Sequence, residues 1–157
     1  KEQATQQKTI EELQKTIKSQ NKYIKKVNKT LNKMGDAEGS SLLNKAHKAF
    51  EKNQQKEALD LYQQVLSENK INNAQKNHVY YNVGLLYYWK KNYDEALVHF
   101  SKIYTKYPRS SFAPKSLLYI ARSFKNQKKN AEASAIYEEL VKNYPKSSQA
   151  KIAKSEM

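Results

Sequence analysis

The sequence has 157 residues with 29 Lys and Arg against 15 Asp and Glu, which gives a formal charge of +14. A chain of this length predicts one domain with an appendage. The absence of cysteine and the low number of glycines, three in all, exclude disulfide scaffolds, Gly-rich phosphate loops and nucleophile elbows. No apolar run approaches the length of a membrane span. We therefore expect an all-α protein whose charge suggests an acidic partner, nucleic acid or an anionic surface.

Residues 1–34 carry a heptad repeat that predicts an oligomerising, parallel coiled coil. Its seam alternates steps of three and four and consists of Ile10, Leu13, Ile17, Gln20, Ile24, Val27, Leu31 and Met34. The seam is narrow and no second apolar face accompanies it. Identical partner chains are therefore favoured over packing on the chain's own domain, where a wider stripe is usual. Only the layer of Ile10 and Leu13 follows the rule for dimers, so a dimer and a trimer both remain open.

A short glycine-containing segment follows the heptads. Residues 35–41 read Gly-Asp-Ala-Glu-Gly-Ser-Ser and hold two of the three glycines. This composition predicts a helix stop, a flexible hinge and a new N-cap. We therefore expect three parts: a coiled coil over 1–34, a hinge linker over 35–41 and a further domain over 42–157.

Residues 42–157 repeat one helix-turn-helix pattern three times. Each copy has an alanine, an aromatic residue four positions later and an aliphatic residue seven positions later. The copies are Ala58, Tyr62 and Val65; Ala96, Phe100 and Ile103; and Ala133, Tyr137 and Leu140. A small residue stands twelve positions before each alanine: Ala46, Gly84 and Ala121. A proline stands twelve positions after the second and third alanines: Pro108 and Pro145. These spacings are those of the tetratricopeptide repeat, and they predict an α-solenoid of three helix pairs with a C-terminal capping helix.

Junction motifs extend this pattern into a family resemblance. The last two copies end in Tyr-Pro-basic-Ser-Ser, at 107–111 and 144–148, and the chain closes with Ala-Lys-Ile-Ala at 150–153. With the Ala-Leu-Asp-Leu-Tyr run at 58–62 and the glycine segment, residues 42–157 resemble the CpoB (YbgF) family of periplasmic Tol-Pal accessory proteins, which coordinate cell division. The resemblance implies a periplasmic, homotrimeric scaffold that contacts a TolA-like inner-membrane protein and a peptidoglycan synthase, and that coordinates peptidoglycan synthesis with outer-membrane constriction. No signal peptide is visible in this sequence.

The first helix of each repeat is expected to turn one face to the core and another to a concave groove. The expected core positions are Leu42, Tyr80, Val83, Tyr87, Leu117, Ile120 and Phe124. The expected groove positions are Leu43, His47 and Phe50, then His78, Tyr81, Leu85 and Tyr88, then Lys115, Leu118, Arg122 and Lys125. This groove passes from aromatic to basic, which predicts a bound peptide or helix with its acidic end near Arg122 and Lys125. The alternative is that Tyr81 and Tyr88 only cover neighbouring helices.

No catalytic, metal or cofactor constellation is visible in the sequence. His47, His78 and His99 stand in separate elements without the spacing of metal ligands. Basic residues alternate with acidic ones, so nucleic acid is not favoured as a partner. The alternative to a scaffold is a basic helical-repeat protein that binds an anionic polymer, either nucleic acid or an envelope polymer. A third hypothesis, an outer-membrane assembly subunit, would require a lipidated N-terminal cysteine.

Overall fold

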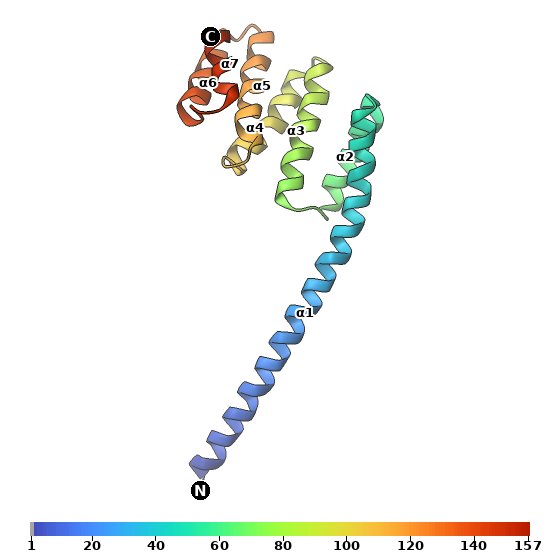
Figure 1. Cartoon of the computed structure of the whole chain (residues 1–157), viewed down its shortest axis with the longest axis vertical. Coiled ribbons are helices and arrows are strands. Elements are labelled where there is room, and N and C mark those ends of the chain that lie inside the picture. The colour runs from blue at the N-terminus through green and yellow to red at the C-terminus, as the bar shows by residue number, and fades with distance from the viewer. Residues whose placement is uncertain (1) are drawn as a thin grey trace. The chain divides into compact units, whose positions relative to one another are not determined.

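The computed structural model describes the backbone of residues 2–157 and the side chains of residues 10–27, 29, 30 and 41–157. Within residues 2–157 the chain forms seven α-helices and no strand (Figure 1). The helices are α1 (Glu2–Glu51), α2 (Gln55–Glu68), α3 (Asn73–Trp89), α4 (Tyr93–Lys106), α5 (Phe112–Asn126), α6 (Asn130–Asn143) and α7 (Ser148–Glu156). The all-α prediction is confirmed. Among the described residues, no helix has the length and apolar character needed to cross a membrane.

The chain divides into two compact units, residues 1–38 and residues 39–157. The hinge predicted at 35–41 spans this division, but its backbone is helical and belongs to α1. The helix stop predicted there is therefore not observed. A glycine inside a helix costs about 1 kcal/mol relative to alanine, which weakens the helix but keeps its hydrogen bonds, unlike proline. The role of 35–41 as a linker stays a prediction.

The apolar seam of the first unit is open to solvent. Its described members, Ile10, Leu13, Ile17, Gln20, Ile24 and Val27, are all exposed, and the apolar ones range from 36% for Val27 to 57% for Leu13. Leu31 and Met34 lie outside the described side chains. An isolated helix with one narrow apolar stripe is only marginally stable in water, and burial of that stripe would stabilise it. Association through this seam stays a prediction.

The second unit is built on the repeated positions found in the sequence. The three alanines, the three aromatic residues and the three aliphatic residues of the pattern are all buried, and all except Ile103 belong to two core clusters. The small residue of the second copy has a direct steric reason. A Cβ placed on Gly84 would lie 2.6 Å from Cε1 of Phe100, which is fully buried on the facing helix α4. The close approach of α3 and α4 therefore requires glycine at this position.

The two helices of each pair are joined by the same left-handed turn. Asn53, Lys91 and Lys128 have φ values of 57°, 59° and 61°, and they occupy equivalent places in the three copies. The residue after each donates its N–H to a carbonyl five positions back, Gln54 to Ala49, Asn92 to Tyr87 and Lys129 to Phe124. This bond is the cap that ends a helix when a residue adopts the left-handed conformation. The repeated turn sets the antiparallel arrangement that aligns α1, α3 and α5.

The predicted core positions are buried in three cases and half-buried in four, of which Leu42, Tyr87 and Phe124 pack against the core and Tyr80 lies at its edge. Val83, Leu117 and Ile120 are buried. The positions that are only half-buried are Leu42, Tyr80, Tyr87 and Phe124. Lysine side chains lie over two of these rings, with Lys102 Nζ 5.4 Å from the Tyr80 centroid and Lys129 Nζ 5.9 Å from that of Phe124. These large rings reach the edge of the helix layers, where a cation completes their packing.

Candidate functional site

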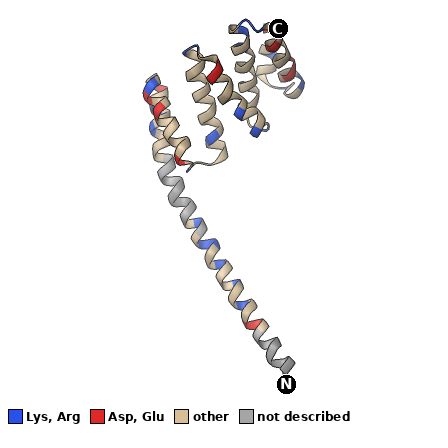
Figure 2. Ribbon diagram, turned by 180° about the vertical axis from the view of Figure 1, so that it is seen from behind, with Lys and Arg blue, Asp and Glu red and all other residues tan. Residues whose placement is uncertain are grey.

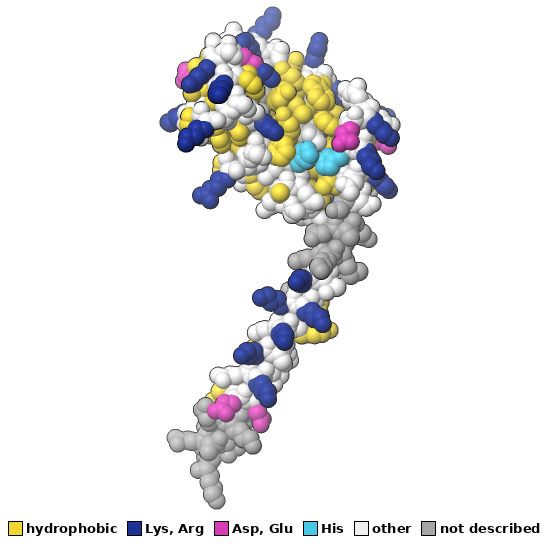
Figure 3. Space-filling model, viewed as in Figure 1, with side chains coloured by type: hydrophobic (Ala, Val, Ile, Leu, Met, Phe, Trp, Pro, Cys, Tyr) yellow, Lys and Arg dark blue, Asp and Glu magenta, His cyan; other side chains and the backbone are white. Residues whose placement is uncertain are grey.

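Aromatic side chains from α1, α3 and α5 meet on one face of the second unit. The His47 ring lies 4.5 Å from that of His78, which stacks on Phe112 at 5.1 Å. Tyr81 lies 5.1 Å from Phe112 and 6.2 Å from Tyr119. We call the connected set the aromatic belt: His47, His78, Tyr81, Tyr88, Phe112 and Tyr119. Figure 3 shows hydrophobic side chains gathered on this face beside two adjacent histidines.

A second aromatic pair lies close to the belt in the fold. Phe50 stacks on Trp89 with centroids 5.6 Å apart and an interplanar angle of 26°. Trp89 is 48% exposed, although it is the largest apolar side chain in the sequence. Tyr88, the preceding residue, packs edge-on against Tyr119 at 5.1 Å and its hydroxyl accepts a hydrogen bond from Asn126. The ends of α1 and α3 thus present rings that are held in place and remain open on one side.

A buried polar network fixes the orientation of His47. The amide of Asn82 donates to the hydroxyl of Tyr62 at 2.8 Å, and that hydroxyl lies 2.7 Å from Nδ1 of His47. Since the Tyr62 oxygen accepts from Asn82, its own proton is available for Nδ1, which matches a neutral imidazole protonated on Nε2. Burial raises the pKa of Tyr62 to about 12. Burial, followed by the nearby His78, lowers the pKa of His47.

These residues border an open pocket of about 500 Å³ between α1 and α3. It is lined by Asn44, His47, Lys48, Phe50, Glu51, His78 and Asn82. Burial lowers the pKa of His78 as well, with Lys115 as the second cause. Two neutral imidazoles, two amides and apolar rings can hydrogen-bond a peptide backbone and bury side chains. No group of three or more His, Cys, Asp or Glu side chains is placed to hold a metal ion in the part of the chain that the structure describes.

The basic end of the predicted groove is occupied by the chain itself. Arg122 Nε lies 3.1 and 3.2 Å from the two carboxylate oxygens of Glu156, and its Nη2 lies 2.5 Å from Oε1. Tyr137 donates to the same carboxylate at 2.8 Å, and Lys125 Nζ donates to the Glu156 carbonyl oxygen at 2.9 Å. The hydrogen bond to Arg122 is the main cause that lowers the pKa of Glu156. A peptide carboxylate would have to displace Glu156 to bind here.

Three predicted groove residues lie in the core instead. Leu43, Leu85 and Leu118 are only 4, 7 and 4% exposed. They belong to the two core clusters, against which partly buried aromatic side chains also pack. The structure therefore corrects their assignment from groove to core. His47, Phe50, His78, Tyr81, Tyr88, Lys115, Arg122 and Lys125 keep some exposed surface.

The sequence reading missed Phe112, Tyr119 and Trp89. On α5 the residues at spacings of three, four and three alternate between ring and cation, as Phe112, Lys115, Tyr119 and Arg122. Lys115 Nζ lies 5.1 Å from the Phe112 centroid and the Arg122 guanidinium 5.4 Å from that of Tyr119. Helical spacing alone would have placed all four on one face. They are not among the positions shared by the copies, so the repeat pattern does not identify them.

Charge outside these contacts is dispersed. Figure 2 shows Lys, Arg, Asp and Glu interspersed along the helices of the second unit, without a continuous basic stripe in that view. Binding of a nucleic-acid backbone relies on several cations aligned on one surface. The aromatic belt is therefore the more distinctive surface of this unit.

Comparisons with known proteins agree with this fold. Residues 78–110 and 115–147 match the tetratricopeptide repeat family, and these are the second and third predicted copies. A comparison with the curated proteins gives no match. Solved structures similar to the chain include two repeat domains. One is the Arabidopsis OM64 TPR domain, with a TM-score of 0.62 and 16% identity over 78% of this chain and 95% of that one. The other is the N-terminal domain of stress-induced protein-1 (STI-1) from C. elegans, with a TM-score of 0.63 and 14% identity over 77% and 95%.

The matches establish a tetratricopeptide-repeat fold for the second unit. Both repeats matched by the family lie within residues 39–157, and the two solved domains are similar over most of their own length. Domains of this kind generally mediate protein-protein interactions and are typically not enzymes.

Proposed function

We propose that this chain is a non-enzymatic scaffold that binds a partner protein on its aromatic belt and on the adjoining pair of Phe50 and Trp89. The observation that carries the proposal is the set of half-open rings held at fixed distances by α1, α3 and α5. Tyrosine, tryptophan and histidine side chains have few rotatable bonds, so they bury a partner's surface with little loss of entropy. The pocket beside His47 and His78 supplies the polar groups that would fix the register of a bound peptide.

The proposed occupant is an extended peptide or a partner helix whose apolar side chains pack on Tyr88 and Trp89. Neutral His47 and His78 each keep one ring nitrogen for a peptide group, because burial disfavours their charged forms. The basic end adds little to this site while Glu156 pairs with Arg122. Affinity is therefore proposed to come from ring contacts and hydrogen bonds rather than from a salt bridge.

Self-association through the first unit completes the scaffold. The exposed seam from Ile10 to Val27 supports it, since apolar residues at heptad spacing gain stability only when a second or third chain covers them. A homotrimer is favoured by the family resemblance, and a dimer remains the alternative. Gln20 would then form a polar layer that sets register at some cost in stability. Several belts on one oligomer would raise the effective affinity for a multivalent partner.

The finer assignment places this scaffold in the periplasmic Tol-Pal system. It is supported by the Tyr-Pro-basic-Ser-Ser junctions and by the repeat spacing that resemble the CpoB (YbgF) family. A TolA-like inner-membrane protein and a peptidoglycan synthase are the proposed partners. The proposed role is to coordinate peptidoglycan synthesis with outer-membrane constriction during cell division.

A binding titration tests the proposal. The soluble domain of a TolA-like protein is titrated into the full chain, into Trp89→Ala and into Val98→Ala, with heat of binding as the readout. Val98 is the matched control, because it is equally exposed, at 48%, and lies on α4 outside the belt. We expect Trp89→Ala to weaken binding about tenfold and Val98→Ala to leave it unchanged. Equal affinity of the two variants would reject the surface formed by the belt and the adjoining Trp89 as the binding site.

The charge of +14 supports one competing function, the binding of an anionic polymer. The salt dependence of binding distinguishes this function from the proposed protein binding. Binding that releases counterions from a polymer falls steeply as salt rises, whereas ring contacts change little. Titrations at low and moderate salt, with heparin as the polymer and the TolA-like domain as the protein, therefore assign the function.

A further inference from the structure

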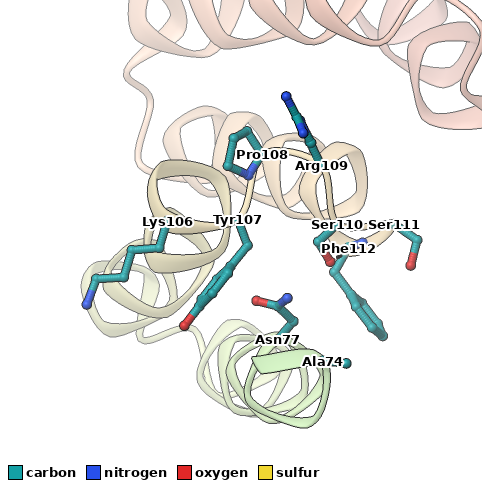
Figure 4. Close-up of a pocket in the computed structure, with 9 residues that line it drawn as sticks. All are labelled: Ala74, Asn77, Lys106, Tyr107, Pro108, Arg109, Ser110, Ser111 and Phe112. Carbon is teal, nitrogen blue, oxygen red and sulfur yellow. Dashed lines mark hydrogen bonds between the residues drawn. The ribbon is translucent and has the colours of Figure 1, made fainter. Parts of the chain in front are cut away.

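A second cavity lies between α3 and the loop that joins α4 to α5. Its volume is about 600 Å³, and its walls include Tyr107, Pro108 and Phe112 (Figure 4). The loop is the first Tyr-Pro-basic-Ser-Ser junction of the sequence. Tyr107 donates its hydroxyl proton to the Asn73 side chain at 3.3 Å, which ties the loop to the start of α3. The capping box of Asn72 and Gln75 fixes that helix start in turn.

The wall of this cavity contains a side-chain amide whose oxygen is closed to solvent and has no hydrogen-bond partner. Asn77 is 6% exposed, and its Oδ1 accepts no hydrogen bond. Figure 4 shows the side chain projecting from α3 into the space between Tyr107 and Phe112. Asn82, five residues further along α3 and 5% exposed, donates to Tyr62 instead. Buried polar atoms are almost always paired, so an unpaired one at the wall of a cavity points to a missing partner.

The fold itself does not require an amide at this position. The repeat step from Ala96 to Ala133 is 37 residues, and the same step from Asn77 leads to Pro114, which has no polar side chain. The third copy packs with that proline at the start of α5. A polar group retained at one copy and absent from the next is therefore more simply explained by a ligand than by packing.

The charges around the cavity are of one sign. Lys106 and Arg109 line its rim, and none of its lining residues is acidic. The N-terminus of α5 is also part of the wall, with no acidic side chain in its first turn. The partial positive charge of that helix end adds to the two cations. These walls favour a negatively charged ligand that has apolar groups and an amide.

We propose that this cavity binds an extended acidic peptide. A backbone amide of the peptide pairs with the Asn77 amide, which presents its oxygen or its nitrogen after a rotation of 180°. An apolar side chain such as proline or leucine packs on Tyr107 and Phe112. An adjacent aspartate or glutamate lies near Arg109. Two cations on a mostly apolar wall suit one short peptide rather than a polymer, whose phosphates or sulfates need a longer row of cations.

The test uses a defined probe and a matched control. The probe is a pool of fluorescent acetylated hexapeptide amides, each with an acidic pair beside a proline or leucine, titrated against the full chain. We expect Arg109→Ala to weaken binding about fivefold, the typical loss of one charge-assisted contact at a rim. Lys146→Ala is the control, because Lys146 is the basic residue of the other junction and does not line this cavity. It should leave the affinity within about twofold.

The side-chain amide of Asn77 gives an independent readout. Its ¹H–¹⁵N signals, identified by their loss in Asn77→Ala, should shift when the peptide pool is added. Absence of binding by the pool, an unshifted Asn77 signal, or equal losses in Arg109→Ala and Lys146→Ala would each overturn the proposal. So would equally tight binding of heparin, because it would indicate attraction to charge alone. Trp89→Ala should leave this binding unchanged, because Trp89 does not line the cavity, whereas Phe112 belongs to both the cavity and the aromatic belt.

Discussion

The two ends of the predicted groove differ in whether other residues of the same chain already bind the groups exposed there. At the basic end the Glu156 carboxylate pairs with Arg122 and the Glu156 backbone carbonyl accepts a hydrogen bond from Lys125, so one residue of α7 contacts both cations. At the aromatic end the rings of the belt contact each other and remain open on one side. A charge can be satisfied by a single opposite charge, whereas exposed aromatic area is removed from water only by a surface that covers it. The open rings are therefore the better indication of a partner.

Gly84→Ala should disturb the aromatic end most. A Cβ at this position would lie within 2.8 Å of three ring atoms of Phe100, and that ring stacks on Tyr119 of the belt. Overpacking a core costs about 1–3 kcal/mol, and the better helix propensity of alanine returns at most about 1 kcal/mol. We expect a net loss of about 1–2 kcal/mol in the free energy of unfolding, measured by urea denaturation. A more stable variant would show that Phe100 moves aside freely.

Tyr62→Phe should loosen the same end without changing its shape. The substitution removes the hydroxyl that accepts from Asn82 and contacts His47, and it leaves the buried Asn82 amide unpaired. A buried polar group without a partner costs about 1–3 kcal/mol. Urea denaturation should show a loss of that size, while Tyr23→Phe on the exposed part of α1 should show none. Equal stabilities of the two variants would contradict the network.

The histidines of the aromatic end should make stability depend on pH. Burial lowers the pKa of His47 and of His78 from 6.5, although Glu51 acts in the opposite direction on His47. As the pH falls below about 6.5 the unfolded chain therefore binds protons first, and the free energy of unfolding decreases until the lower folded pKa values are passed. His99 has a lowered pKa and contributes in the same window.

A comparison of the wild-type chain with one variant measures the contribution of His47 and His78 to this pH dependence. The midpoint of thermal unfolding is measured between about pH 8 and pH 5 for the wild-type chain and for His78→Gln. The wild-type chain should lose more of its thermal stability over this range, because the variant has one fewer group with a lowered pKa and relieves His47 of its neighbour. If the unfolding midpoint of both chains falls equally with pH, folding does not change the pKa values of His47 and His78.

Glu156→Gln tests the basic end and should have the smallest effect on stability. Arg122 and Glu156 are partly exposed, so solvent screens their attraction, and the loss should be about 0.5–1 kcal/mol. Because the pKa of Glu156 is lowered, its contribution is present above about pH 4.5 and is lost as the pH falls further. The variant should also bind a carboxylate-terminated peptide more tightly than the wild-type chain. Unchanged affinity would mean that Glu156 does not compete for Arg122.

The repeat architecture could be predicted because it depends on spacing. The alanine, aromatic and small positions recur at nearly constant steps, and each is buried in the structure, with Gly84 against Phe100 as the tightest contact. The turns between paired helices could not be predicted by the same means. Lys91 and Lys128 take left-handed conformations that their side chains do not favour, and the packing of the helices on either side imposes them.

The candidate site could be predicted in part. His47, His78, Tyr81 and Tyr88 come together as expected, because one face of the first helices follows from the repeat register. The burial of Leu43 and Leu118 depends on how neighbouring first helices approach each other, which spacing within one helix does not give. The pairing of Arg122 with Glu156 joins residues 34 positions apart, and only the path of α7 reveals it.

One titration tests the central claim that partners bind at the aromatic end and not at the basic end. The soluble TolA-like domain is titrated into the wild-type chain, Tyr88→Ala and Arg122→Gln, each first shown to be folded by its thermal transition. We expect Tyr88→Ala to weaken binding about tenfold and Arg122→Gln to leave it within about twofold, because Glu156 already occupies Arg122. A loss in Arg122→Gln that equals or exceeds the loss in Tyr88→Ala would contradict the account.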